Sequence, residues 1–168
     1  MAPFAFTLLN DGNFASGGFD NKTTIWNTTS YDIIKTLNGH TDYINTLALL
    51  NNGFLVSGSA DKTIRIWNVE LGSTIKTLYG HSQTVRCLLQ LDESTLLSGS
   101  FDQTIKMWDL SSGKLKMSFE SHSDKVLSLI RLNNGYVASS SEDNTIKICH
   151  IKRKEVKRTT NTDHTDKV

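Results

Sequence analysis

Serine, histidine and aspartate recur in this chain at one spacing, and they are the residue types of a hydrolytic triad. His40, His81 and His122 are each followed by a serine 17 residues later and by an aspartate 21 residues later. In such a triad the histidine accepts the serine proton and the aspartate orients the imidazole ring. A hydrolase built on the second set would use Ser98 as nucleophile, His81 as base and Asp102 as the orienting acid.

These residues belong to a repeat that runs through the whole chain. Its period is about 41 residues, and a fixed period of about 20 to 50 residues is typical of a solenoid, a propeller or an array. Trp26, Trp67 and Trp108 stand one period apart, and Cys149 occupies the next position. The length of 168 residues holds four such periods with four residues over. The serine and aspartate columns keep the same step: Ser16, Ser57, Ser98, Ser139, Asp20, Asp61, Asp102 and Asp143.

Each copy contains four short runs of apolar and β-branched residues bounded by turn formers. In the second copy these runs lie at 44–50, 54–58, 63–67 and 74–78. Such a pattern predicts a four-stranded antiparallel meander with short turns. The first turn is an Asp-Gly or Asn-Gly pair in three copies, which suits a tight hairpin. A single meander cannot bury both of its faces, so the copies must pack on one another.

The motifs resemble the WD-repeat (WD40) β-propeller family. Gly39-His40 and Gly80-His81 match its Gly-His pair, and Trp67-Asn68 and Trp108-Asp109 match the dipeptide that ends the third strand. The resemblance covers nearly the whole chain and implies four-stranded blades arranged radially around a channel. The expected fold is therefore all-β, with four propeller blades, one for each period, that form a partial or half propeller.

The resemblance also implies a structural role for the triad-like residues. In WD-repeat proteins a hydrogen-bond chain from Asp to His to Ser to the Trp indole ties the loop before a blade to its third strand. An enzyme needs one triad beside one oxyanion site, whereas this chain repeats the set and lacks a nucleophile-elbow motif. We therefore interpret the sets as structural tetrads and expect no catalytic residue and no enzyme activity. The complete tetrads are His40, Ser57, Asp61 and Trp67, and His81, Ser98, Asp102 and Trp108.

Two further sets are incomplete. The first copy lacks a histidine, and the fourth copy has Cys149 in the tryptophan position. Because cysteine is a weak donor and too short to replace an indole, we expect the fourth blade to be less firmly tied. The partial tetrads are Ser16, Asp20 and Trp26, and His122, Ser139 and Asp143.

We expect one propeller domain over residues 1–168, with blades at about 3–38, 39–79, 80–120 and 121–161. Residues 162–168 match the start of a further repeat, since Asp163 to Val168 resembles Ser121 to Val126. Family rings usually hold seven or eight blades, so four blades would leave two apolar flanks exposed. Three arrangements stay open: a fragment of a larger propeller, a half-ring that dimerises into eight blades, and a tight four-bladed ring.

The resemblance places the partner-binding face at the loops before each first strand and at the turns between second and third strands. Aromatic residues dominate the energetics of interfaces, so aromatic residues on this face are candidates for partner contact. Two alternatives are that the phenylalanines pack on their own turns and that the charged residues are merely solvated. The candidate partner-binding residues are Phe19, Tyr43, Phe101, Lys125 and Glu142.

Composition excludes several classes of function. With 18 Lys and Arg against 17 Asp and Glu, the net charge of +1 argues against a nucleic-acid partner. The basic stretch 152–158 suggests either a nuclear-import or phosphate patch, or a charged last strand that discourages edge pairing. No apolar run approaches the roughly 20 residues of a membrane helix, so no membrane partner is expected.

Cysteine and histidine usage predicts neither disulfides nor a metal site. Two cysteines cannot form a disulfide framework, which indicates a reduced, cytoplasmic protein, with a nuclear location as the alternative. Cys149, His150, His122 and His164 suggest zinc by type, but they lack CxxC or paired-His spacing. We expect no metal and no cofactor.

The function that these features favour is a non-catalytic protein–protein interaction scaffold, which presents loop residues on a rigid propeller face. Its partners would be proteins or peptides. The alternative is a structural assembly module whose exposed blade flanks build a larger, eight-bladed ring, either as a homodimer or within a longer chain.

Overall fold

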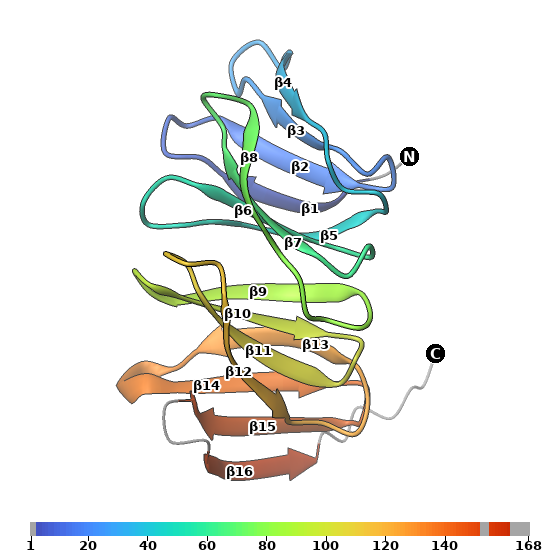
Figure 1. Ribbon diagram of the computed structural model, residues 1–168, viewed down its shortest axis with the longest axis vertical. Coiled ribbons are helices and arrows are strands. Elements are labelled where there is room, and N and C mark those ends of the chain that lie inside the picture. The colour runs from blue at the N-terminus through green and yellow to red at the C-terminus, as the bar shows by residue number, and fades with distance from the viewer. Residues whose placement is uncertain (1–2, 152–154, 162–168) are drawn as a thin grey trace.

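The chain forms four separate four-stranded sheets (Figure 1). The computed structural model describes residues 3–151 and 155–161. A 3-10 turn, η1, lies at Asn133–Gly135, and within the described residues no helix is long and apolar enough to span a membrane. The predicted all-β propeller class is confirmed.

Each sheet is one blade. Blade 1 consists of β1 (Pro3–Leu8), β2 (Phe14–Gly18), β3 (Thr23–Trp26) and β4 (Ile33–Leu37). Blade 2 consists of β5 (Ile44–Leu49), β6 (Leu55–Ser59), β7 (Ile64–Asn68) and β8 (Ser73–Leu78). Blade 3 consists of β9 (Val85–Asp92), β10 (Thr95–Ser100), β11 (Thr104–Asp109) and β12 (Leu115–Glu120). Blade 4 consists of β13 (Val126–Arg131), β14 (Tyr136–Ser141), β15 (Thr145–His150) and β16 (Glu155–Asn161).

Strand order in every blade follows the chain, so each blade is an antiparallel meander. The first strands β1, β5, β9 and β13 contact one another in sequence and form the inner side of the arc. The fourth strands β4, β8, β12 and β16 are the opposite edges of the sheets. The blades are therefore arranged side by side around a common inner side, as in a propeller.

The first hairpin of a blade is made by the predicted Asp-Gly and Asn-Gly pairs. Gly12, Gly53 and Gly135 have φ values of +85°, +84° and +82°. Glycine adopts this left-handed conformation without steric cost, which is why these dipeptides form the tight turn. Blade 3 has Glu93 and Ser94 there, and its hairpin is closed by pairing of Asp92 with Thr95.

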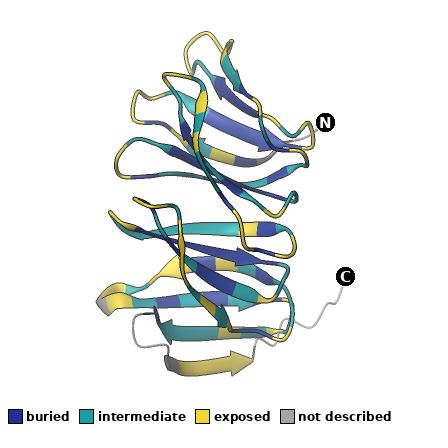
Figure 2. Cartoon of the chain, viewed as in Figure 1, coloured by how far each residue is buried: buried dark blue, intermediate teal, exposed yellow. Residues whose placement is uncertain are grey.

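The hydrophobic core is divided into three clusters, and each cluster lies between two neighbouring blades. Ile25 and Leu37 of blade 1 pack with Leu55 and Trp67 of blade 2. The second and third clusters join blades 2 and 3 and blades 3 and 4 in the same way. Burying one such side chain stabilises the fold by about 1.5–3 kcal/mol, so most of a blade's stabilisation depends on its neighbour. Figure 2 shows this burial, with residues 157–161 of β16 exposed at the edge of blade 4.

A glycine column allows adjacent blades to approach closely. A Cβ atom at Gly58 would lie 2.7 Å from Val85 Cγ1 of the next blade, and one at Gly17 would lie 2.6 Å from Ile44 Cγ2. Gly99 stands in the same relation to Val126, at 2.7 Å. These three glycines are one repeat period apart, and each sits opposite the residue that begins the next blade.

The four blades form an open arc. Blades 1 and 4 lie at opposite ends of the molecule (Figure 1). Phe6 and Leu8 of blade 1 are 59% and 70% exposed, whereas Leu47, which matches Phe6 in blade 2, is 9% exposed. On blade 4, Ile146 is 38% exposed, whereas its counterpart Ile64 is fully buried. The alternative of a tight four-bladed ring is wrong, because such a ring would cover both flanks. Residues 162–168, predicted to begin a further repeat, lie outside the described residues.

Candidate functional site

The triad-like residues of blade 2 form one continuous hydrogen-bond network. His40 Nδ1 lies 2.7 Å from Asp61 Oδ2, and His40 Nε2 lies 2.7 Å from Ser57 Oγ. Trp67 Nε1 donates to the same Ser57 oxygen at 2.8 Å. The Thr41 amide also donates to Asp61, at 3.1 Å, which holds the linker between blades 1 and 2 against the β6–β7 turn. In blade 3, His81, Ser98, Asp102 and Trp108 form the same bonds at 2.7, 2.7 and 2.8 Å.

The direction of these bonds follows from the carboxylate. A carboxylate only accepts hydrogen bonds, so His40 Nδ1 carries a proton and donates it to Asp61. The other ring nitrogen, Nε2, is hydrogen-bonded to the Ser57 hydroxyl, and the Ser57 oxygen accepts from the indole. Burial by itself would raise the pKa of Asp61, but hydrogen bonds from His40 and Thr63 outweigh it and hold that pKa well below its usual range. Asp102 is held in the same way by His81 and Thr104.

Burial makes these networks unsuitable for catalysis. Ser57 and Ser98 have no exposed surface, and both oxygens already accept an indole N–H. A serine nucleophile must reach the carbonyl carbon of a substrate. The Asp–His–Ser hydrogen bonds of a triad are therefore present, but a substrate cannot reach Ser57 or Ser98.

In blade 4 the network has three members. His122 lies 2.9 Å from Asp143 and 2.8 Å from Ser139, and Ser139 is 3.5 Å from the Lys147 carbonyl. Burial lowers the pKa of His122, and its bond to Asp143 offsets only part of that effect. Cys149 occupies the tryptophan position, so no indole N–H donates to Ser139 from there.

The residue before the histidine changes together with the tryptophan. A Cβ at Gly80 would lie 3.1 Å from Trp108 Cη2, and one at Gly39 would lie 3.1 Å from Trp67 Cη2. The corresponding residue of blade 4 is Ser121, which precedes the blade that has no indole. The Gly-His pair and the tryptophan are thus one steric unit.

In blade 1 the structure joins only part of the set. Trp26 Nε1 donates to Ser16 Oγ at 2.8 Å, and the Lys22 amide donates to Asp20 Oδ1 at 3.2 Å. In the part of the chain that the structure describes, no histidine bonds to either residue.

The loop face is built from the turns and linkers that the tetrads hold. The amides of Ala60 and Phe101 donate to the carbonyls of Tyr43 and Thr84, at 2.9 and 3.0 Å. The Glu142 amide donates to the Lys125 carbonyl at 3.0 Å. In blades 2 to 4, each residue that precedes a tetrad aspartate is therefore bonded to the residue that precedes the first strand of the same blade.

The five predicted partner-binding residues form two clusters on this face. Phe19, which is 46% exposed, packs its ring 5.7 Å from the ring of Tyr43. Lys125 Nζ lies 5.1 Å from the Phe101 ring and 2.8 Å from Glu142 Oε2. Each cluster joins two blades, because Phe19 and Tyr43 belong to blades 1 and 2, and Phe101 and Lys125 belong to blades 3 and 4. The phenylalanines thus contact the neighbouring blade's linker.

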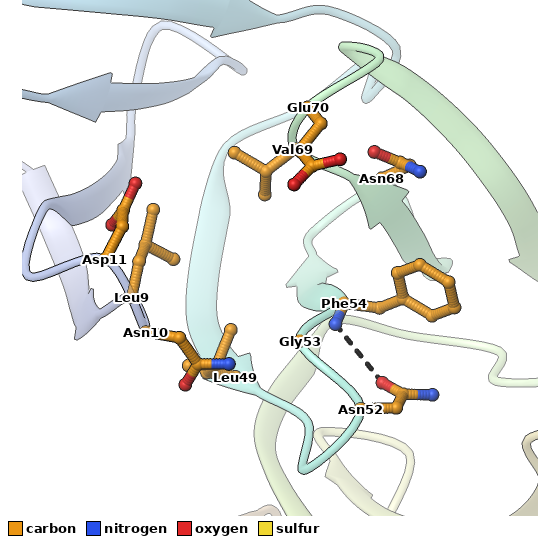
Figure 3. A pocket seen from close by; sticks show the side chains of 10 residues that line it. All are labelled: Leu9, Asn10, Asp11, Leu49, Asn52, Gly53, Phe54, Asn68, Val69 and Glu70. Atoms are coloured by element: carbon orange, nitrogen blue, oxygen red, sulfur yellow. Dashed lines mark hydrogen bonds between the residues drawn. The ribbon is translucent and has the colours of Figure 1, made fainter.

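The opposite face carries a hollow of about 290 Å³ between blades 1 and 2 (Figure 3). Leu9 and Asp11 line it from the β1–β2 turn, and Val69 and Glu70 line it from the β7–β8 turn. A hollow of about 280 Å³ occurs one blade further on, between blades 2 and 3. Because the hollow recurs with the repeat, we attribute it to blade geometry, and the loop face remains the candidate site.

Most of the cysteines and histidines that suggest zinc by type lie within the described residues. Within them, no three His, Cys, Asp or Glu side chains are placed to share a metal ion, and His164 lies outside them. Burial raises the pKa of Cys87 to about 12 and also raises the pKa of Cys149. Neither thiol is a thiolate nucleophile at neutral pH.

Comparison with known families agrees with this geometry. A family model described as "WD domain, G-beta repeat" matches residues 31–68, 72–109 and 113–150. The chain belongs to the WD40 repeat family. WD40 repeats generally mediate protein–protein interactions and scaffolding, and the family is generally non-catalytic.

Comparison with solved structures supports the fold. The structure of a protein named U3-55K matches with a TM-score of 0.87 at 20% sequence identity, over 96% of this chain and 52% of that chain. The chain thus spans about half of the length of that protein, and at this identity the likeness shows the fold alone. No curated protein matches the chain.

Each WD40 sequence repeat is offset from a blade. The repeat at 31–68 contains β4 of blade 1 and then β5, β6 and β7 of blade 2. One repeat therefore joins two neighbouring blades, with the histidine linker between them. This offset explains why the tetrad ties the linker to the blade that follows it.

One feature of the WD40 turns was not predicted from the sequence. Asn21, Lys62, Gln103 and Asn144 occupy the same position of successive repeats and have φ values of +63°, +72°, +70° and +61°. Asparagine tolerates this conformation better than other non-glycine residues. Asn21 and Asn144 in this column were the sequence signal that could have predicted a left-handed residue in this turn.

Proposed function

We propose that the chain is a non-catalytic scaffold that binds a protein or peptide partner through its loop face. The observation that carries this proposal is the pair of clusters on that face, Phe19 with Tyr43 and Phe101 with Lys125 and Glu142. Each cluster bridges two blades, so its geometry is set by the packing of the propeller. Preorganised aromatic side chains lose little entropy on binding, which favours affinity.

The chemistry of the two clusters indicates the kind of partner. Lys125 is paired with Glu142, so this part of the face carries little net charge. Phe19 remains 46% exposed. A peptide segment that buries apolar side chains against these rings fits this surface better than a polyanion, whose affinity would need unpaired cations.

The Phe101→Ala variant tests this function. Peptides that bind the wild-type chain would be selected from a displayed random library, and their dissociation constants measured for wild type and variant. We expect Phe101→Ala to raise the dissociation constant by about tenfold or more, as loss of an aromatic hot spot does. We expect the melting temperature to change by only about one or two degrees, because Phe101 lies on the face and outside the seam clusters.

Tyr31→Ala provides the matched control. Tyr31 is 75% exposed and lies in the β3–β4 turn at the opposite end of blade 1. The selected peptides should bind this variant as well as they bind wild type. Equal losses in both variants would contradict the proposal, and a large drop in melting temperature for Phe101→Ala would assign Phe101 to packing.

A second function, assembly into a larger ring, is favoured by one observation. Phe6 and Leu8 are exposed on the free flank of blade 1, at positions that the other blades use for inter-blade packing.

A further inference from the structure

A cavity of about 120 Å³ lies at the site where blade 1 differs from the other blades. Ser16, Asp20 and Trp26 contribute to its walls. At the same repeat positions in blade 2, the His40 ring sits between Ser57 and Asp61. The cavity is therefore the space that an imidazole ring fills in each of the other three blades.

The polar atoms around this cavity are already oriented as in the complete networks. Trp26 donates to Ser16 Oγ at 2.8 Å, the same distance as from Trp67 to Ser57. The Lys22 amide holds Asp20 Oδ1, as the Thr63 amide holds Asp61. Among the described residues, the Ser16 hydroxyl hydrogen and Asp20 Oδ2 have no partner.

Blade 1 lacks one supporting group of the full networks. Lys22 stands where blades 2 to 4 have a threonine, and a threonine hydroxyl donates to the tetrad aspartate in each of those blades. An imidazole bound in blade 1 would therefore depend on Ser16 and Asp20 and on burial of the flank around them.

The flank around the cavity is apolar. Phe14 stacks on Trp26 with ring centres 6.1 Å apart, and Phe6 lies 6.3 Å from Phe14. Phe6 and Leu8 are 59% and 70% exposed. In blades 2 and 3 the corresponding face packs against the preceding blade, and the linker from that blade carries the tetrad histidine. The preceding blade therefore supplies both the apolar contacts and the imidazole.

We propose that this cavity accepts the imidazole of His164 from a second copy of the chain, whose blade 4 then covers the exposed flank of blade 1. The chain has five histidines. His40, His81 and His122 fill their own tetrads, and the His150 ring packs 5.1 Å from Tyr136. His164 is the histidine that remains.

Sequence around His164 supports this assignment. Residues 163–168 read Asp-His-Thr-Asp-Lys-Val, and residues 121–126 read Ser-His-Ser-Asp-Lys-Val. The latter segment delivers His122 to its tetrad and leads into β13. Segment 163–168 lies outside the described residues, so it is assigned by this match alone.

The two free flanks are complementary. Blade 4 exposes Ile130 and Ile146, by 54% and 38%. Ile64 and Ile105, the counterparts of Ile146, are buried against the following blade. Contact of blade 4 with blade 1 of another copy therefore pairs two unlike flanks, as every seam within the chain does. Such head-to-tail contacts close into rings where the geometry permits.

Sedimentation of the full chain tests the proposal. We expect a dimer of twice the 18.7 kDa chain mass. His164→Ala and Asp20→Asn should each raise the dimer dissociation constant by about tenfold or more, since each removes a charge-assisted hydrogen bond. Asp32→Asn is the matched control, because Asp32 is an exposed acid of blade 1 outside the cavity lining, and it should leave the dimer unchanged.

A peptide titration tests the cavity separately. A peptide of residues 161–168 would be added to the full-length His164→Ala chain, beside a peptide with alanine at position 164. The first peptide should shift Trp26 fluorescence and the second should bind about tenfold more weakly, while Trp67 and Trp108 are only 1% exposed. Phe19 lines this cavity and also belongs to a loop-face cluster, whereas Phe101 does not line it. The proposed function is tested at Phe101, so its failure and the failure of this proposal are distinguishable.

Three results would overturn the proposal. One is a chain that stays monomeric at the highest concentration tested. Another is a dimer whose dissociation constant is unchanged in His164→Ala. The third is equal affinity of the two peptides.

Discussion

One serine position, repeated in four blades, shows how surroundings decide what a side chain can do. Ser57 and Ser98 are fully buried and bonded on both sides, by a histidine and by an indole. Ser139 keeps its histidine and loses the indole, and Ser16 keeps its indole without a histidine. The residue types of a hydrolytic triad thus serve as structural ties between linkers and blades.

The residue His122 gives a pH-dependent prediction. Burial lowers its pKa in the folded state, so the folded chain binds fewer protons than the unfolded chain. Stability should therefore fall as pH decreases through about 6.5, the ordinary histidine pKa of the unfolded chain. The depressed pKa values of Asp61, Asp102 and Asp143 add a further loss below about pH 3.9.

NMR titration of the His122 ring, assigned with a His122→Gln variant, measures this pKa directly. Urea unfolding at pH 7 and pH 5 measures the accompanying change in stability. A His122 pKa above about 6.5, or stability that rises between pH 7 and pH 5, would contradict the prediction.

Residue contacts within a repeat could be anticipated, whereas those between repeats could not. The spacing of His40, Ser57 and Asp61 was sufficient to group them, because the resemblance supplies the geometry of one blade. The contact of Lys125 with Phe101 joins two blades, and it depends on the angle between those blades. The repeat period in the sequence carries no information about that angle.

At the scale of the strand, the seam between blades depends on a glycine in the second strand. Gly58 lies in β6, and a Cβ there would meet Val85 Cγ1 of β9 at 2.7 Å. We expect Gly58→Ala to reduce the free energy of unfolding by about 1–3 kcal/mol, since overpacking forces the neighbouring blade to shift. Urea denaturation measures this change.

Ser140 offers the matched control for that variant. It occupies the same repeat position in blade 4, where the chain already carries a larger side chain. Ser140→Ala should change the free energy of unfolding by less than about 0.5 kcal/mol. Equal effects of the two substitutions would show that the close approach of β6 and β9 is not limiting.

Most strands could be predicted from the sequence because local signals agree with the fold. Alternation of apolar residues and the Asn-Gly pair at Asn52-Gly53 specify the hairpin of β5 and β6. The left-handed conformation of Lys62 could not be read from its residue type, because lysine has no preference for positive φ. There the tetrad turn imposes the conformation.

At the scale of the molecule, the chain is an open arc with two unlike flanks. The repeat period predicted the blades and the exposed flanks but left open whether four blades close on themselves. Closure depends on the angle between neighbouring blades, which emerges from packing at three seams. The missing histidine of the first copy was visible in the sequence, but the sequence did not show that its place stays open as a cavity between Ser16 and Asp20.

The central claim is that the loop face, held by the histidine networks, binds the partner. Hydrogen exchange of the chain with and without a selected peptide tests it most directly. We predict that the peptide protects amides of the turns and linkers around Phe19, Tyr43, Phe101 and Lys125. Protection confined to the opposite face, around Asp11, would contradict the account.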